Sequence, residues 1–232
     1  MIRGLYSATA GMLATSQQQD VTAHNLTHAV KPGYRREVLR FESVGGDGDL
    51  VGPSVQLHTD VTPGATEHTG NPLDVALTGP GFFRVQGPNG SLFTRNGVFQ
   101  LNGQGQLVTM EGLAVNGTTG SVRLPIETSN IEILDNGTVL ADGNEVDQLS
   151  VETFADPSAL QRVGTSYFAP PPGVTPTKVE PAVQQGYREA SNTTVVHEMV
   201  QMISGLRQFE ATQRALRSIS DSIGLLTRPT GR

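Results

Sequence analysis

Two histidines one helical turn apart are the residues most suggestive of metal chemistry. His24 and His28 stand in the run HNLTH, a spacing that places two imidazoles on one face of a helix. A zinc protease would need a glutamate beside the first histidine as general base, and a third ligand nearby. The sequence offers neither, so we expect no metal at these histidines.

A short acidic run, GGDGDLVG, could suggest a calcium loop. Asp47 and Asp49 supply two carboxylates, but the remaining oxygen ligands of a calcium loop are missing. We therefore expect a flexible acidic loop and no bound metal.

A glycine-proline loop, Thr78-Gly79-Pro80-Gly81, follows a short apolar run and could suggest phosphate binding. Phosphate loops open a helix, whose N-terminal N–H groups bind the anion. Here Phe82-Phe83-Arg84-Val85 follows, which is typical of a strand, and no Gly-Lys-Ser/Thr is present. The loop is predicted to be a turn between two strands.

No catalytic constellation is found in the chain. There is no cysteine, so thiolate chemistry and disulfides are excluded, and no G-x-S-x-G elbow is present. We expect a protein that is not an enzyme and uses no cofactor.

Charge and composition narrow the possible partners. The 232 residues carry a net charge of -6, with mildly basic ends and an acidic centre, which argues against nucleic acid. No apolar run approaches the roughly 20 residues that span a bilayer. The first residues lack the unbroken apolar stretch of a cleaved signal peptide.

A heptad pattern near the C-terminus predicts a long amphipathic helix. Apolar residues recur every seven positions from Val195 to Ile223, and Asn192 is a plausible N-cap. The predicted apolar stripe of this helix consists of Val195, Met199, Met202, Leu206, Phe209, Leu216 and Ile223.

The N-terminus repeats this pattern more weakly, with Leu5, Met12 and Leu26 in its stripe. Because the stripe is narrow, the helix needs a partner, and the C-terminal helix is the obvious one. It should stop before Pro32-Gly33, since a residue preceding proline avoids helical geometry.

The segment after this helix is expected to turn tightly. Gly33 lies just past the helix end, where a left-handed conformation is common. Arg35 and Arg36 are expected on the surface of a polar loop.

Between the ends the apolar period changes to two. Short β-like runs alternate with hairpin signals such as Asn96-Gly97 and Asn136-Gly137, which predicts a meander of antiparallel strands. Phe82, Phe83, Phe93 and Phe99 fall at strand positions expected in the core.

The expected fold class is α+β, with long N- and C-terminal helices paired as a coiled-coil-like domain and a central antiparallel β-rich domain. The predicted division is a discontinuous helical domain from residues 1–31 and 190–232, an extended connector from 32–69, and a β-rich outer domain from 70–185.

Four stretches in order along the chain resemble the flagellar hook–basal-body rod proteins. They are HNLTHAVKPGYRRE, TGNPLDVALTGPGFFRV, FTRNGVFQLNGQGQLVT and SNTTVVHEMVQMISGLRQFEATQRAL. The family pattern at the end of the first helix is kept at Asn25, Leu26, Gly33, Tyr34 and Arg35, whereas Thr27 and His28 depart from it. The runs TPG, PLDVAL and MISGLRQFE look most like the proximal rod members, with the distal rod members next.

The resemblance implies a structural axial component of the rod, which polymerises into the drive shaft that carries torque from motor to hook. The implied partners are copies of itself, other flagellar rod and hook proteins, and the flagellar type III export apparatus. The implied location is the periplasmic rod of the basal body, reached without a cleaved signal peptide. The stripe residues named above would form the assembly interface, and Asn25, Leu26, Gly33 and Tyr34 would form a junction motif.

One alternative remains open. The chain could be a secreted β-domain protein that binds glycan or peptidoglycan, with its helices as a dimerisation stalk. Such a binder should present aromatic residues in a pocket of the β domain, yet aromatic residues make up only 5% of the chain.

Overall fold

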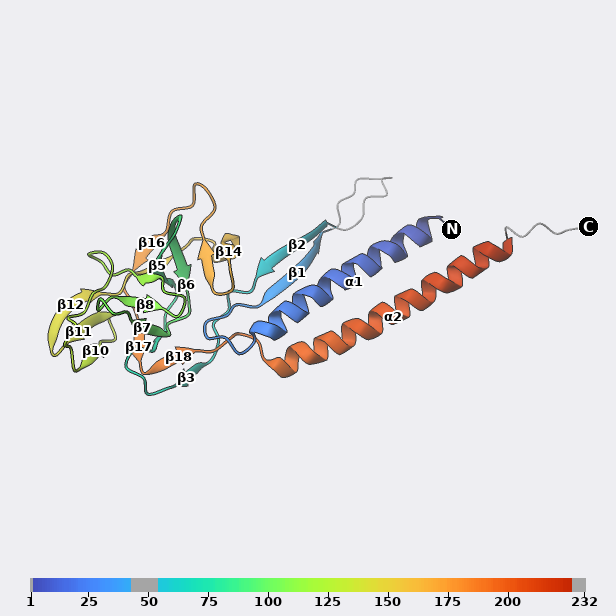
Figure 1. Ribbon diagram of the computed structural model, residues 1–232. Helices are drawn as coiled ribbons and strands as arrows, with labels where there is room; N and C mark the ends of the chain where they lie inside the picture. Colours follow the sequence, from blue (N-terminus) through green and yellow to red (C-terminus); the bar gives the residue numbers. More distant parts are fainter. Residues whose placement is uncertain (1, 43–53, 227–232) are drawn as a thin grey trace, which may run out of the picture. The chain divides into compact units, whose positions relative to one another are not determined.

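The computed structural model describes residues 2–42 and 54–226 of the chain (Figure 1). Asp47 and Asp49 lie outside these residues. The chain forms two compact units, the first from Met1–Thr27, Glu37–His58 and Thr194–Arg232, and the second from His28–Arg36 and Thr59–Thr193. The backbone therefore crosses from one unit to the other four times.

Two helices dominate the first unit, which we call the helical unit. They are α1 (Ile2–His28) and α2 (Val195–Leu226), and they run side by side in opposite directions (Figure 1). The unit also contains β1 (Glu37–Glu42) and nearly all of β2 (Ser54–Thr59), which form a two-stranded sheet.

The predicted coiled-coil-like pairing of the two helices is wrong. The side chains that would form its seam are not buried: Met199 is 50% exposed, Ile203 52% and Leu206 46%. Where the helices come close, Gly205 of α2 faces the polar side chain of Gln19 on α1. A coiled coil requires apolar knobs inserted into holes on the facing helix, and these residues do not provide them.

The start of α2 is also different from the prediction. Thr194 caps the helix: its hydroxyl accepts a hydrogen bond from the His197 N–H, and its carbonyl accepts one from the Glu198 N–H. Asn192 instead donates its side-chain amide to the carbonyls of Asp60 and Thr62. The amide is therefore used to hold a loop and not the helix terminus.

The second unit, which we call the β unit, is built from short antiparallel strands. Its strands are β3 (Thr66–His68), β4 (Val75–Leu77), β5 (Phe82–Gly87), β6 (Gly90–Thr94), β7 (Phe99–Leu101), β8 (Leu107–Thr109), β9 (Ala114–Val115), β10 (Ile131–Ile133), β11 (Thr138–Ala141), β12 (Asn144–Gln148), β13 (Val151–Thr153), β14 (Gln161–Val163), β15 (Tyr167–Ala169), β16 (Thr177–Val179), β17 (Val183–Gln185) and β18 (Tyr187–Glu189). A short 3₁₀ helix covers Pro157–Ala159.

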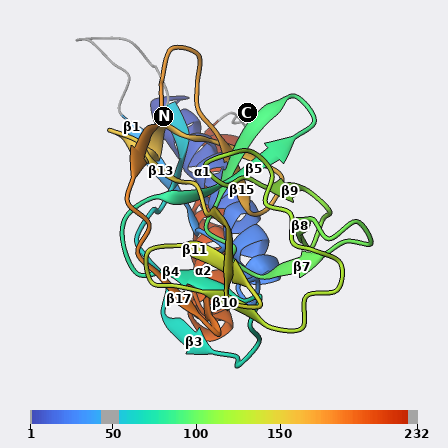
Figure 2. The ribbon, with the colours of Figure 1, turned by 90° about the vertical axis from the view of Figure 1, so that its left-hand side faces the viewer.

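The main sheet has the strand order β14-β15-β6-β5-β9-β8-β7, and β13 pairs with both β5 and β16. Figure 2 shows β9, β8 and β7 following one another at one side of the unit. Smaller sheets are formed by β10-β11-β12, by β4 with β17, and by β3 with β18. The predicted antiparallel β region is therefore present.

The predicted phenylalanines lie in the core of the β unit. Phe83 and Phe99 are buried in the main apolar cluster, where their rings meet edge to face. Phe82 and Phe93 belong to a second cluster, in which both rings contact Phe154. Such aromatic contacts add to the free energy gained by burying apolar area.

The glycine-proline loop is a turn between strands, as predicted. It joins β4 to β5, and no helix follows it. Gly81 has φ +123°, a backbone conformation that favours glycine.

The described helices are not long and apolar enough to cross a membrane.

Candidate functional site

The apolar stripe of α2 is the candidate functional surface of the helical unit. Val195, Met202, Phe209 and Leu216 are partly buried, whereas Met199 and Leu206 are about half exposed. Further apolar side chains lie exposed beside them, namely Val196 (72%), Val200 (59%) and Ile203 (52%). The side chain of Ile223 lies outside the described part.

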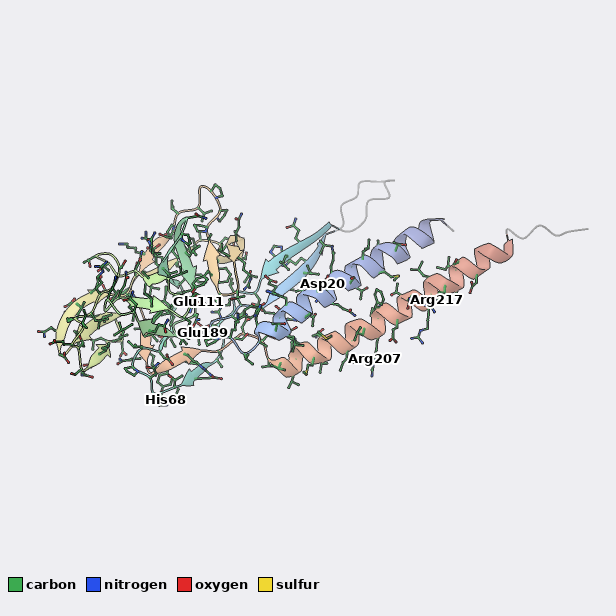
Figure 3. The ribbon with its side chains drawn as sticks, in the orientation of Figure 1. Asp20, His68, Glu111, Glu189, Arg207 and Arg217 are labelled. Carbon is green, nitrogen blue, oxygen red and sulfur yellow. The ribbon has the colours of Figure 1, made fainter. Side chains whose placement is uncertain are left out.

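Several neighbouring apolar side chains at the surface of one helix point to a surface that another protein covers. Charged residues lie on the same helix, and Figure 3 shows Arg207 and Arg217 along it. Helix α2 is therefore amphipathic, and the stripe is its apolar face.

The corresponding stripe of α1 is thinner. Met12 and Leu26 are partly buried, Leu13 is exposed, and the side chain of Leu5 lies outside the described part. Because α1 carries few large apolar residues, its own contribution to burial is small.

The end of α1 is tied to β1 by side-chain hydrogen bonds. The buried Asn25 amide donates to the Glu37 carbonyl and accepts from the Glu37 N–H, both at 2.9 Å. His24 Nδ1 lies 3.1 Å from a carboxylate oxygen of Glu37. Asn25 therefore satisfies both backbone polar groups of the residue at which β1 begins.

The junction residues of the β unit form a tight turn. Gly33 has φ +65°, so the predicted left-handed conformation is confirmed. Tyr34 is completely buried, with the guanidinium of Arg162 over its ring at 4.9 Å and the ring of His28 at 5.5 Å. The Arg162 guanidinium also donates to the Arg35 carbonyl.

The prediction that Arg35 lies on the surface is wrong. Its side chain is 1% exposed, and Nη2 donates to a carboxylate oxygen of Glu189 at 2.6 Å. The same oxygen accepts the Gly64 N–H at 2.8 Å, while Arg95 Nη1 lies 3.5 Å from the other oxygen. Arg36 is only partly buried, and its N–H donates to Asn192.

This buried group of Arg35, Arg95 and Glu189 was missed by reasoning from the sequence. Arg35 and Glu189 are separated by 154 positions, so no local spacing connects them. Arg95, which directly follows β6, gave no clear signal, because an arginine at the end of a strand is as readily exposed to solvent.

The structure gives the two histidines different partners, Glu37 for His24 and Tyr34 for His28. Among the described residues, no group of three or more histidine, aspartate or glutamate side chains is placed to hold a metal ion.

Comparison with known proteins identifies the family. Residues 76–141 match the flagellar hook protein FlgE/F/G D1 domain, and residues 184–227 match the flagellar basal body rod FlgEFG protein C-terminal region. These two segments contain strands β5 to β9 of the main sheet and α2.

Curated relatives match along almost the whole length. The FlgF rod protein of Escherichia coli is 33% identical and that of Salmonella typhimurium 31%, each over 97% of this chain and 96% of the relative. The FlgG rod protein of Buchnera aphidicola is 30% identical over 96% of this chain and 97% of the relative. Long apolar-striped helices at both ends, a β unit between them and these full-length matches agree: the chain belongs to the family of flagellar basal-body rod proteins.

Proposed function

We propose that this chain is a structural subunit of the bacterial flagellar basal-body rod, and that it polymerises into the shaft that carries torque from the motor to the hook. Its implied partners are further copies of itself and other rod and hook proteins. Motifs at residues 62–64, 72–77 and 202–210 favour the proximal part of the rod. No enzymatic activity and no cofactor belong to this proposal.

The observation that carries the proposal is the exposed apolar stripe of α2. In a single chain these side chains are at most partly buried, and full burial of a Leu or Phe side chain is worth about 1.5–3 kcal/mol. Contact with neighbouring subunits would recover this free energy. When such contacts are heterologous and do not close into a ring, they generate a helical assembly.

The assembly interface in this proposal consists of the stripe residues on both helices. These are Leu5, Met12 and Leu26 on α1, with Val195, Met199, Met202, Leu206, Phe209, Leu216 and Ile223 on α2. Asn25, Leu26, Gly33 and Tyr34 would fix the direction in which the chain leaves α1.

The proposal also includes the route and the division of labour. The subunit would leave the cell unfolded through the flagellar type III export apparatus, without a cleaved signal peptide, and assemble in the periplasmic rod. Residues 1–31 with 190–232 would build the rod core, 32–69 would connect, and 70–185 would lie outside. The absence of cysteine is compatible with that route, since no disulfide has to form after export.

The test places a charge on the stripe and, as a control, at the adjacent exposed position of the same helix, which lies outside the stripe. Phe209→Asp puts a carboxylate where the proposal expects a desolvated helix contact, which costs several kcal/mol. Gln208→Asp adds the same carboxylate at the exposed neighbouring position. Both variants are expressed in cells that lack the wild-type chain, and swimming and purified basal bodies are examined.

We expect Phe209→Asp to abolish rod assembly and motility at normal export levels, while Gln208→Asp assembles and swims. The β unit should melt at the same temperature in both variants, because its apolar clusters do not include Phe209. Normal rods with Phe209→Asp would contradict the interface.

A further inference from the structure

A cavity of about 290 Å³ opens in the β unit beside the buried arginine pair. Its wall includes the glycine-proline turn at Gly79–Gly81, the ring of Phe82, and the side chains of Val61 and Arg95. Its volume is close to the lower end of the range for small-molecule sites, about 300–1,000 Å³.

Among the described residues that line this wall, Arg95 provides the only charged side chain. It is 6% exposed, and its guanidinium lies over the Phe82 ring at 5.5 Å from the centroid. Among the described residues, the long contact from Nη1 to Glu189 is the only hydrogen bond that this side chain makes, and Nε is buried without a partner. A planar guanidinium with five N–H donors is thus largely unsatisfied beside a cavity.

The charges around Arg95 do not balance. Arg35 and Arg95 share the single carboxylate of Glu189, and that carboxylate lies closer to Arg35, at 2.6 Å against 3.5 Å. Burial lowers the pKa of Arg95, and the charge of Arg35 lowers it further, although Glu189 opposes both. One more negative charge in the cavity would neutralise the group.

The rest of the wall selects the kind of anion. Val61, Leu77, Phe82 and three prolines make it mainly apolar, so a strongly hydrated anion with several charges would lose more hydration than one guanidinium can replace. A single carboxylate can accept two parallel N–H groups from arginine, and an apolar stem behind it would fill the remaining volume.

We propose that this cavity binds a carboxylate carried on a short apolar stem, the group that a glutamate side chain of a partner protein or a free short-chain acid presents. The proposal assigns the cavity of the β unit a ligand, and it is independent of the assembly surface on α2.

The test uses nuclear magnetic resonance of the ¹⁵N-labelled full chain, following the amides of Gly79 and Gly81 and the Arg95 Nε–H. Butyrate is the probe, butyramide its neutral match, and inorganic phosphate the control for a bare charge. Val61→Trp narrows the cavity without touching the ion cluster, and Arg123→Gln removes an exposed arginine elsewhere on the unit. Arg95→Gln also disturbs Glu189, so Val61→Trp carries the test.

Butyrate should produce saturable shifts at all three positions, while butyramide and phosphate should bind at least tenfold more weakly. Val61→Trp should weaken butyrate binding at least tenfold with an unchanged melting temperature, and Arg123→Gln should leave it unchanged. Equal binding of butyrate and butyramide, equal binding of phosphate, or full binding by Val61→Trp would each overturn the proposal.

Two capped tripeptides identify the source of the carboxylate. Saturation by Gly-Glu-Gly but not by Gly-Gln-Gly supports the cavity as a site for a protein side chain. If butyrate binds and neither peptide does, the result supports the cavity as a site for a free acid. Absence of saturable shifts with every carboxylate overturns the site.

Discussion

Glu189 shows how much of the β unit can depend on one carboxylate. It accepts hydrogen bonds from Arg35 and from the Gly64 N–H, and it faces Arg95 as well. It lies among the strands of the β unit (Figure 3). Its carbonyl also accepts the Gly33 N–H, so β18 is joined to the turn after α1 by both main chain and side chain.

Replacing Glu189 with glutamine should destabilise the β unit by about 3–5 kcal/mol, because two buried arginines lose their counter-charge. The matched control is Glu67→Gln. Glu67 on β3 pairs with Arg188, the neighbour of Glu189 on β18, but both of these side chains are about half exposed. Its loss should cost about 0–1 kcal/mol. Urea denaturation of both variants makes the comparison, and similar midpoints would contradict the burial argument.

Asp147 is the second residue on which several bonds converge. Its carboxylate accepts from the hydroxyls of Thr118 and Thr119, at 2.8 and 2.7 Å, and from the Gln148 N–H at 2.8 Å. Burial alone would raise the pKa of Asp147, but these hydrogen bonds outweigh it and lower the pKa below its ordinary value. The ionised form is therefore the one that the fold stabilises.

Asp147→Asn should cost about 1–3 kcal/mol at pH 7, since an amide cannot accept all of these bonds. A folded-state pKa below the unfolded value gives stability that is complete above the unfolded pKa, about 3.9, and is lost as pH falls through the folded pKa. The difference between wild type and variant should therefore shrink below about pH 4. Urea midpoints at pH 7, 4 and 3 measure it, and a constant difference would exclude this role.

At the scale of structural elements, the turn after α1 tolerates little change. A Cβ at Gly33 would overlap the backbone of Arg95 and Asn96, and φ is +65°. Gly112 has a similar φ of +85°, but a Cβ there would meet no atom within 4 Å. Substitutions at these two glycines therefore distinguish the cost of backbone strain from the cost of steric overlap.

Gly112→Ala should cost about 1–2 kcal/mol, the penalty of a left-handed alanine. Gly33→Ala carries that penalty and overpacking as well, so it should cost about 1–3 kcal/mol more. Thermal denaturation of the two variants tests this difference. If both lose the same stability, the turn after α1 relaxes more easily than its contacts indicate.

Local patterns predicted the two terminal helices and the strands of the central region, because strands and helices follow from apolar period and turn residues. Strands β1, β2 and β3 were not predicted, since they lie in residues 32–69, which were expected to form an extended connector. Phe83 and Phe99 lie in short β-like runs and are each followed by a polar residue, so their burial could be predicted without knowing which strands they pair with. The coiled-coil-like packing of α1 against α2 was predicted wrongly, since a heptad pattern reports an apolar face but not what covers it. Arg35 and Asn192 were misplaced for a similar reason: Glu189 and Asp60, which hold them, lie far away along the chain.

At the scale of the whole molecule, the two units differ in how they are stabilised. The β unit has two clusters of buried apolar side chains. The buried side chains described in α1 are polar, Thr22 and Asn25, and the fully buried one in α2 is Glu198. Most of the stability of a protein helix comes from packing of its apolar face, and these two helices bury little apolar surface.

Amide hydrogen exchange of the isolated chain should therefore be slow in the β unit and fast in the helical unit. Amides of β5 and β6 should exchange only by global unfolding of the β unit. Those of α1 and of the C-terminal part of α2 should exchange much faster. Mass spectrometry of the dilute monomer measures both. Slow exchange throughout α1 in a chain shown to be monomeric would mean that the helical unit is stable by itself.

The four crossings of the backbone between the units also affect resistance to proteolysis. Two domains joined by one linker separate after a single cut. Here a cut at any one crossing leaves the β unit covalently attached to at least one segment of the helical unit. After one proteolytic cleavage in a surface loop, peptide bonds would still connect the two units. A single cleavage therefore need not detach the β unit.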